Sequence, residues 1–199
     1  SKILNISRIR FNLSSQDMSK SYLEILPKIK ALFFDVDGVL TDGSVSMMSD
    51  GSMVRIMSSK DGYILHLAAK MNIPITIITG GNSQVVKDRL LQLGVQDVYL
   101  KSADKLAVFE EHLLGYDLKP EECLYMGDDI PDYEVMSKIG LACCPNDAAV
   151  EIKKISHYIS PLKGGEGCVR DIVEQFLKIH NKWFKPEYLN TPEASKFTW

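Results

Sequence analysis

The fold prediction for this chain starts from residues 31–38, which read Ala31-Leu32-Phe33-Phe34-Asp35-Val36-Asp37-Gly38. A short run that is apolar at every position is typical of a parallel strand that is buried on both faces. Here the run leads directly into two acidic residues and a glycine. In doubly wound sheets, ligands bind beyond the carboxyl ends of the strands. The stretch therefore predicts a central strand that delivers Asp35 and Asp37 to a site.

The chain on either side of this strand alternates between apolar runs and amphipathic stretches. Further strands are expected at 73–79, 97–100, 122–126 and 140–144. Helices are expected at 62–71, 83–93, 105–114, 132–137, 148–155 and 168–179. Strands that alternate with helices imply βαβ units. The predicted fold class is α/β, with a doubly wound, mostly parallel sheet.

The length of 199 residues suits one such domain with short appendages. We expect an N-terminal extension at 1–29, the α/β domain at 30–180 and a C-terminal extension at 181–199. One β-hairpin insertion is expected at 44–58, where Asp50-Gly51 is a typical hairpin turn. Apolar side chains stand on both faces of this hairpin: Val45, Met47, Met48, Met53, Val54, Ile56 and Met57. One face can pack on its own domain, and the other predicts contact with a second subunit.

Composition excludes several classes of protein. Apolar residues make up 45% of the chain and charged residues 25%, which is typical of a globular protein. The formal net charge of -3 gives no basic footprint for nucleic acid or an anionic membrane. We find no apolar run of about 18 residues that would span a membrane. The first residues do not resemble a secretory signal, so a cytoplasmic location is expected.

Chemically informative residues follow several of the predicted strands. Thr79-Gly80-Gly81 follows the second apolar run, Lys105 opens a helix, and Asp128, Asp129 and Asp132 follow a later strand. Carboxylates gathered at one sheet edge repel one another unless a cation lies among them. Oxygen ligands without cysteine or histidine favour Mg²⁺. A lysine and a threonine beside that ion suit a phosphate, so the sequence predicts phosphoryl transfer.

Four motifs in this order resemble those of the haloacid dehalogenase superfamily of phosphohydrolases. They read FFDVDGVLTDG at 33–43, IITGG at 77–81, SADK at 102–105 and GDDIPD at 127–132. The resemblance implies that Asp35 is a nucleophile that forms an aspartyl-phosphate. It also implies that Asp37 is the general acid and base, and that Lys105 neutralises the nucleophile and the phosphate.

The same resemblance implies the remaining parts of the site. Thr79 and Gly80 would bind the phosphate. Mg²⁺ would be held by Asp35, Asp128 and the backbone carbonyl of Asp37. Two supporting residues, Asp129 and Asp132, would orient waters or the lysine.

Spacing narrows the resemblance to members without a cap domain, because the gaps between motifs hold only a hairpin and single helices. VDGVLTDG, KDGYIL at 60–65, GDDIPD and GGEGCVRDI at 164–172 resemble 3-deoxy-D-manno-octulosonate 8-phosphate phosphatases, which act in lipopolysaccharide sugar synthesis. This subfamily implies a homotetramer built through the hairpin 44–58 and the C-terminal tail. It also implies that Lys60 and Arg170 lie near the sugar.

Two alternatives remain open at the level of sequence. Gly81 departs from the TGR of many eight-carbon enzymes and from the TGE of nine-carbon relatives. A phosphatase for 2-keto-3-deoxynononate 9-phosphate is therefore the first alternative, although Lys60-Asp61-Gly62 favours eight carbons. The second alternative is a phosphate-binding or regulatory module without catalysis, because a fold does not fix a function. The presence of Asp37, the acid and base that turnover needs, argues for an enzyme.

Overall fold

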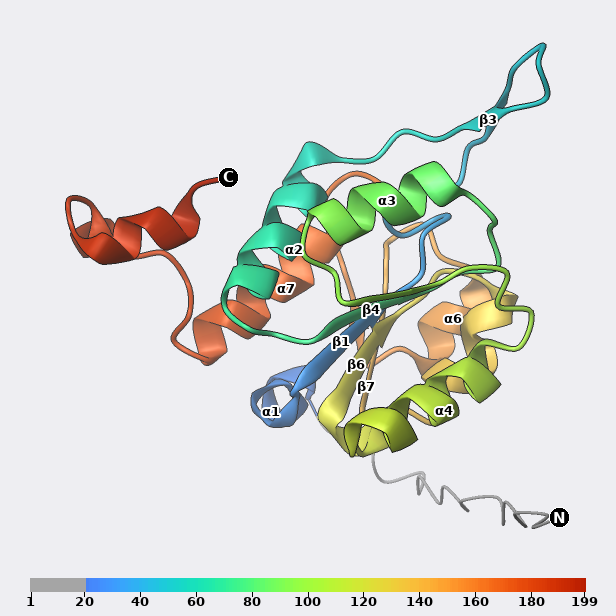
Figure 1. Cartoon of the computed structure of the whole chain (residues 1–199). Coiled ribbons are helices and arrows are strands. Elements are labelled where there is room, and N and C mark those ends of the chain that lie inside the picture. The colour runs from blue at the N-terminus through green and yellow to red at the C-terminus, as the bar shows by residue number, and fades with distance from the viewer. Residues whose placement is uncertain (1–20) are drawn as a thin grey trace, which may run out of the picture.

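A six-stranded parallel sheet forms the centre of the molecule in a computed structural model that describes residues 21–199 (Figure 1). The strand order is β5-β4-β1-β6-β7-β8, and every neighbouring pair is parallel. The strands are β1 (Ala31–Phe34), β4 (Ile75–Ile78), β5 (Asp97–Tyr99), β6 (Cys123–Met126), β7 (Leu141–Cys144) and β8 (Tyr158–Ile159). The predicted α/β fold class is thereby confirmed. The chain leaves β1 for β4 on one side and reaches β6 on the other, so β1 stands at the switch point of the sheet, where ligands bind.

Helices cover both faces of the sheet. One layer contains α2 (Ser59–Lys70), α3 (Gln84–Gln92) and α7 (Cys168–Ile179), and the other contains α4 (Lys105–Tyr116), α5 (Tyr133–Met136) and α6 (Val150–Ile155). Side chains of a strand alternate between the faces. Accordingly, Leu32 and Phe34 of β1 pack in the core under the first layer, and Phe33 packs in the core under the second. Burial on both faces explains why β1 carries no polar residue.

The boundaries of the elements differ from the predictions by a few residues. Helix α2 begins at Ser59 because the Ser58 side chain accepts hydrogen bonds from the backbone of Lys60 and Asp61. Helix α7 has the predicted bounds, and its apolar stripe is buried in the core. Strand β8 was not predicted, because two residues show no periodicity.

The hairpin consists of β2 (Ser46–Met47) and β3 (Met53–Val54), which pair antiparallel. It projects from the body of the domain (Figure 1). Gly51 at its tip has a φ of +83°, a backbone conformation that residues other than glycine rarely adopt. Met47 is 84% exposed and Ile56 is 79% exposed. Apart from this hairpin, only α2 separates β1 from β4 and only α3 separates β4 from β5, so neither gap holds a cap domain.

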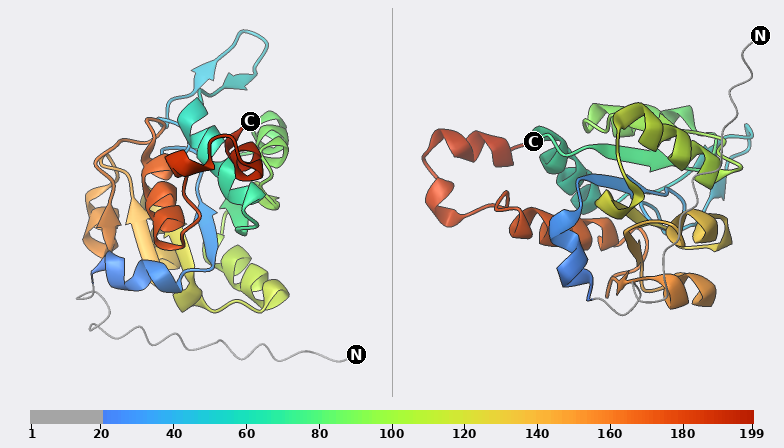
Figure 2. Two further views of the ribbon diagram at one scale, coloured as in Figure 1. Left: turned by 90° about the vertical axis from the view of Figure 1, so that its left-hand side faces the viewer. Right: turned by 90° about the horizontal axis from the view of Figure 1, so that it is seen from below.

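Both ends of the described chain pack on the domain. Residues 1–20 of the predicted N-terminal extension lie outside the described residues. The rest forms α1 (Tyr22–Ile25) and η2 (Leu26–Lys28), in which Leu26 is buried in the core. The C-terminal extension forms η5 (Pro186–Tyr188) and η6 (Pro192–Phe197) and returns to α2 (Figure 2). There the Tyr63 hydroxyl donates to the carbonyl of Phe197 at 2.9 Å. Within residues 21–199, no helix has the length and apolar character that crossing a membrane requires.

Candidate active site

A cavity of about 480 Å³ opens at the carboxyl ends of β1, β4 and β6. The strand-end loops place eight of the ten candidate residues around it: Asp35, Asp37, Thr79, Gly80, Lys105, Asp128, Asp129 and Asp132. These residues come from four motifs that are spread over almost a hundred positions of sequence. The parallel sheet unites them because all of its strands end at the same edge.

Lys105 is the buried cation of the cavity. Its Nζ lies 2.8 Å from Oδ2 of Asp35 and 2.7 Å from Oδ1 of Asp132. Asp104 caps the helix that begins at Lys105, because its side chain accepts from the backbone N–H of Ala107 at 2.9 Å. Burial lowers the pKa of Lys105, but the charges of Asp35 and Asp132 outweigh it, and the pKa is raised overall. Lys105 therefore carries its charge at neutral pH.

The carboxylate of Asp132 is occupied by protein donors. Its Oδ1 accepts from Lys105 and also from the Tyr125 hydroxyl at 2.8 Å. Its Oδ2 accepts from the backbone N–H of Asp128 at 3.1 Å and of Asp129 at 3.5 Å. Asp132 thus orients Lys105 and the loop after β6. Tyr125 is a residue next to the site that the sequence analysis missed, although a hydroxyl within the apolar strand β6 was a signal.

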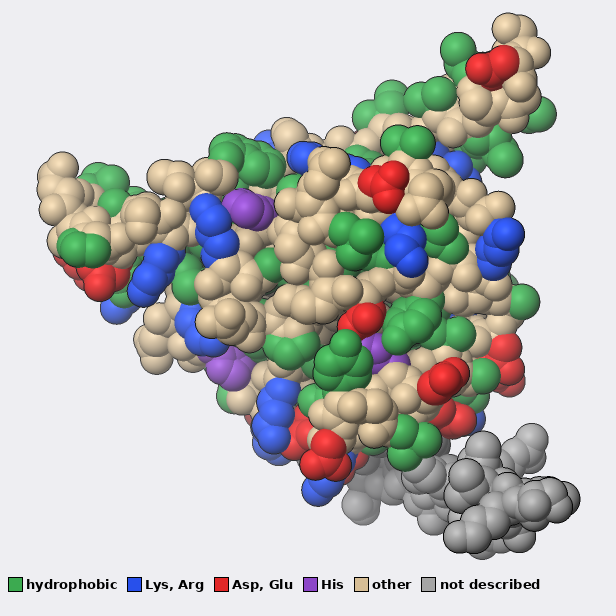
Figure 3. Space-filling view, in the orientation of Figure 1, with side chains coloured by type: hydrophobic (Ala, Val, Ile, Leu, Met, Phe, Trp, Pro, Cys, Tyr) green, Lys and Arg blue, Asp and Glu red, His purple; other side chains and the backbone are tan. Residues whose placement is uncertain are grey.

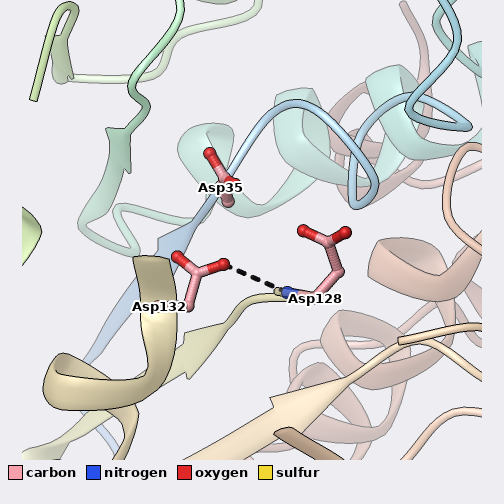
Figure 4. Close-up of side chains that lie close together, drawn as sticks. All are labelled: Asp35, Asp128 and Asp132. Carbon is pink, nitrogen blue, oxygen red and sulfur yellow. Dashed lines mark hydrogen bonds between the residues drawn. The ribbon is translucent and has the colours of Figure 1, made fainter. Parts of the chain in front are cut away.

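Asp35 and Asp128 lie close together at the cavity (Figure 4). A carboxylate oxygen of each lies within 4.8 Å of the other and of one from Asp132. Burial and the charge of Asp132, opposed by Lys105, raise the pKa of Asp35 to about 6. Burial, with the charges of Asp35 and Asp132, raises the pKa of Asp128 to about 7. This crowding of negative charge is relieved by a hard cation, so the residues fit Mg²⁺.

The loop after β1 is shaped to admit Asp128. Gly38 has a φ of +86°, and a Cβ built on it would lie 2.0 Å from Oδ2 of Asp128. A second glycine supports this loop from behind, because a Cβ on Gly164 would lie 2.0 Å from the carbonyl oxygen of Gly38. The backbone N–H of Gly165 also donates to the carbonyl of Val39 at 3.0 Å. The glycine-rich segment therefore packs on the loop after β1 of its own chain.

The phosphate-binding candidates lie after β4. Thr79 is buried, and its Oγ1 accepts from the backbone N–H of Gly81 at 3.0 Å. This bond closes the turn at Gly80, which lines the cavity. Opposite this turn, the carboxylate of Asp37 pairs with the guanidinium of Arg55. Arg55 is a second residue that the sequence analysis missed, because nothing in its local pattern separates it from an ordinary hairpin cation.

The two remaining candidates lie outside the cavity of this chain. Lys60 is exposed at the start of α2. The Arg170 guanidinium lies 5.4 Å from the ring centre of Tyr63 and 5.2 Å from that of Trp183, and its Nε pairs with Glu174 at 3.1 Å. A role of Lys60 or Arg170 at a substrate stays a prediction that needs a neighbouring subunit.

The sequence of this chain is similar to those of known phosphohydrolases. Residues 91–170 match the family model of haloacid dehalogenase-like hydrolases. The 3-deoxy-D-manno-octulosonate 8-phosphate phosphatase of Yersinia pestis is 34% identical over 154 residues, which are 77% of this chain and 82% of that protein. The Salmonella typhi phosphatase of the same name is 35% identical over the same shares.

Solved structures of phosphatases with the same name are also similar to this chain. The crystal structure of the Yersinia pestis phosphatase aligns with a TM-score of 0.78 and 32% identity, over 80% of this chain and 86% of that one. The phosphatase of Moraxella catarrhalis, in complex with magnesium ion, phosphate ion and KDO, aligns with a TM-score of 0.77 and 29% identity, over 80% and 92%. The resemblance inferred from the four motifs is confirmed, and the chain belongs to the 3-deoxy-D-manno-octulosonate 8-phosphate phosphatase family of haloacid dehalogenase-like hydrolases.

Proposed function

We propose that this chain is a Mg²⁺-dependent phosphomonoesterase that hydrolyses 3-deoxy-D-manno-octulosonate 8-phosphate to the free sugar acid and phosphate. The observation that carries the proposal is the convergence of Asp35, Asp128 and Lys105 at one sheet edge. Support comes from the Moraxella catarrhalis relative, whose structure contains magnesium, phosphate and the KDO product.

The geometry supports a two-step reaction. An oxygen of Asp35 attacks phosphorus while the ester bond to the sugar oxygen breaks, and Lys105 offsets the charge of the nucleophile at 2.8 Å. Asp37 gives its proton to the departing sugar oxygen. Asp37 then takes a proton from water, the water oxygen bonds to phosphorus, and the bond from Asp35 to phosphorus breaks. Thr79 and the backbone at Gly80 bind the phosphate oxygens. When held by Asp35 and Asp128, Mg²⁺ supplies charge neutralisation on the phosphate.

Replacing the nucleophile tests this proposal. Asp35→Asn should reduce phosphate release from the sugar acid phosphate to background, because an amide does not form the aspartyl-phosphate. Asp42→Asn is the control, since Asp42 lies on the same loop but is exposed, and its Oδ1 accepts from Ser44 at 2.8 Å. Phosphate release is measured with Mg²⁺ and with a chelator. Substantial turnover by Asp35→Asn, or full activity in the chelator, would refute the proposal.

Sugar specificity needs a direct comparison. Gly81 has no side chain that could select between the two sugars. The relatives compared above are named as phosphatases of the eight-carbon substrate. We expect kcat/KM for the eight-carbon sugar acid phosphate to exceed that for the nine-carbon one. The ratio reports differential binding of the two transition states. A ratio in favour of nine carbons would reassign the substrate.

We further propose a homotetramer whose subunits meet through the hairpin 44–58. Several exposed apolar side chains lie along the projecting hairpin (Figure 3), and exposed apolar surface of this kind is typical of interfaces. Met47→Asp should lower the molar mass measured by light scattering, because a buried unpaired charge is costly. An unchanged mass would refute a hairpin interface. The cytoplasm is the location we propose, since Cys123, Cys143, Cys144 and Cys168 are free and buried.

A further inference from the structure

The Arg55 side chain is bound to both oxygens of the Asp37 carboxylate. Nε lies 2.5 Å from Oδ1, and Nη2 lies 3.2 Å from Oδ2. A guanidinium that contacts both oxygens fixes the plane of the carboxylate as well as its position. The Arg55 side chain is only 11% exposed, whereas the Asp37 side chain is 34% exposed and open to the cavity that it lines. It joins the root of the hairpin to the residue that serves as acid and base in the proposed reaction.

Arg55 reaches the reaction only through Asp37. It does not line the catalytic cavity, whereas it lines a small neighbouring cavity together with Val36, Val86 and Leu100. Asp37 lines both cavities. Asp37 is therefore in contact with the guanidinium and also lines the cavity in which the substrate would bind.

Gly81 leaves the space that this arrangement needs. A Cβ on Gly81 would lie 3.3 Å from Oδ2 of Asp37 and 3.9 Å from Nη2 of Arg55. A longer side chain at this position would compete with the guanidinium for the same carboxylate. Gly81, which departs from both the TGR and the TGE patterns, thus lies next to the ion pair of Arg55 and Asp37.

We propose that Arg55 is a positioning residue that holds the Asp37 carboxyl for proton transfer to the leaving group. This inference rests on the proposed phosphomonoesterase reaction. The guanidinium donates to both oxygens, and we assign the proton of the first step to Oδ2, which has the longer of the two contacts. In the first step the bond from Asp35 to phosphorus forms, the ester P–O bond breaks, and the proton on Oδ2 passes to the departing oxygen. Without Arg55 the Asp37 carboxyl is free to rotate, so its proton points at the leaving oxygen of the bound substrate for a smaller fraction of the time.

The role predicts a dependence on the leaving group. A sugar alkoxide needs a proton as it leaves, whereas p-nitrophenolate leaves without one. Because kcat/KM reports the steps up to phosphoryl transfer to Asp35, it isolates the step in which the acid acts. General acid catalysis contributes about 10²–10⁴-fold, and loss of orientation removes part of this contribution. A residue that only supports the fold would affect both substrates equally.

The test compares Arg55→Met with the unmodified protein on the sugar acid phosphate and on p-nitrophenyl phosphate. Methionine keeps an apolar stem in the small cavity and removes the guanidinium. We expect kcat/KM to fall by about tenfold or more for the sugar acid phosphate, and by less than about threefold for p-nitrophenyl phosphate. Arg55→Lys should recover part of the loss, because it keeps a cation but has no planar fork. Asp50→Asn is the matched control, since Asp50 is the other charged residue of the hairpin 44–58.

The outcomes separate this inference from the proposed function. If the unmodified protein hydrolyses p-nitrophenyl phosphate and phenyl phosphate but not the sugar acid phosphate, the proposed substrate is wrong. The role of Arg55 is then tested on these two aryl phosphates, because phenyl phosphate has the poorer leaving group. If the sugar acid phosphate is hydrolysed and Arg55→Met slows all substrates by the same factor, or slows none, the positioning role is overturned. A selective loss for the poor leaving group, with Asp50→Asn unchanged, supports it.

Discussion

Asp61 is a buried carboxyl whose charge the fold accommodates poorly. Its Oδ1 accepts from the backbone N–H of Arg170 at 2.7 Å, at the first turn of α7, while its buried Oδ2 has no partner among the described residues. Burial raises the pKa of Asp61 from 3.8 to about 6, although the hydrogen bond from Arg170 and the one from Gly167 oppose the shift. Asp61→Asn keeps the shape and the accepting oxygen and removes the charge.

The raised pKa fixes the sign of the expected pH dependence. The folded protein holds the Asp61 proton more tightly than the unfolded chain does. The resulting stability is fully present below about pH 4 and is lost as the pH rises through about 6. A shift of about two units corresponds to roughly 3 kcal/mol. The unmodified protein should therefore lose about 2.4 kcal/mol relative to Asp61→Asn between pH 4 and pH 7, because roughly 0.6 kcal/mol is already lost at pH 4.

Urea unfolding of both proteins at several values between pH 4 and pH 7 measures this difference. Asp35 and Asp128 also titrate in this range, but both proteins contain them, so their contributions cancel. The N-terminus of α7 attracts negative charge by about 0.3–1 kcal/mol, which acts in the opposite direction. If the unmodified protein gains stability relative to Asp61→Asn as the pH rises, or if the difference does not change, the reasoning from burial is wrong.

Two further predictions concern the loop after β1 and the domain boundary. Gly38→Ala should abolish Mg²⁺-dependent phosphate release, because the new Cβ would displace Asp128. Gly51→Ala should keep the activity, because Gly51 has a similar φ of +83° but open surroundings. Equal activity in the two variants would contradict the steric argument. Removing 181–199 should leave a folded, active domain whose free energy of unfolding is lower by roughly 2–4 kcal/mol, because partly buried aromatics including Trp183 are lost. A truncated chain that does not fold would show, in circular dichroism, that the predicted boundary at 180 is wrong.

Local patterns in the sequence were enough to predict five of the six strands of the sheet and the core of the candidate site. Strand β1 is apolar at each position because both of its faces are buried, and this property is visible in four consecutive letters. The acidic, threonine and lysine motifs each follow a strand. Once parallel strands are inferred, their convergence follows from topology, since all the carboxyl ends share one edge. Side-chain coordinates were not needed to bring Asp35, Lys105 and Asp128 together.

Which side chains support the site, and which point elsewhere, depends on contacts that are visible in the three-dimensional structure alone. The pairs Arg55–Asp37 and Tyr125–Asp132 join different segments, and Arg170 packs between two aromatic rings outside the cavity. Periodicity and motif spacing are local properties of a chain, so they report the face on which a residue stands. The partner of a side chain depends on how loops from distant elements pack against one another, and that packing is settled only when the whole core has formed.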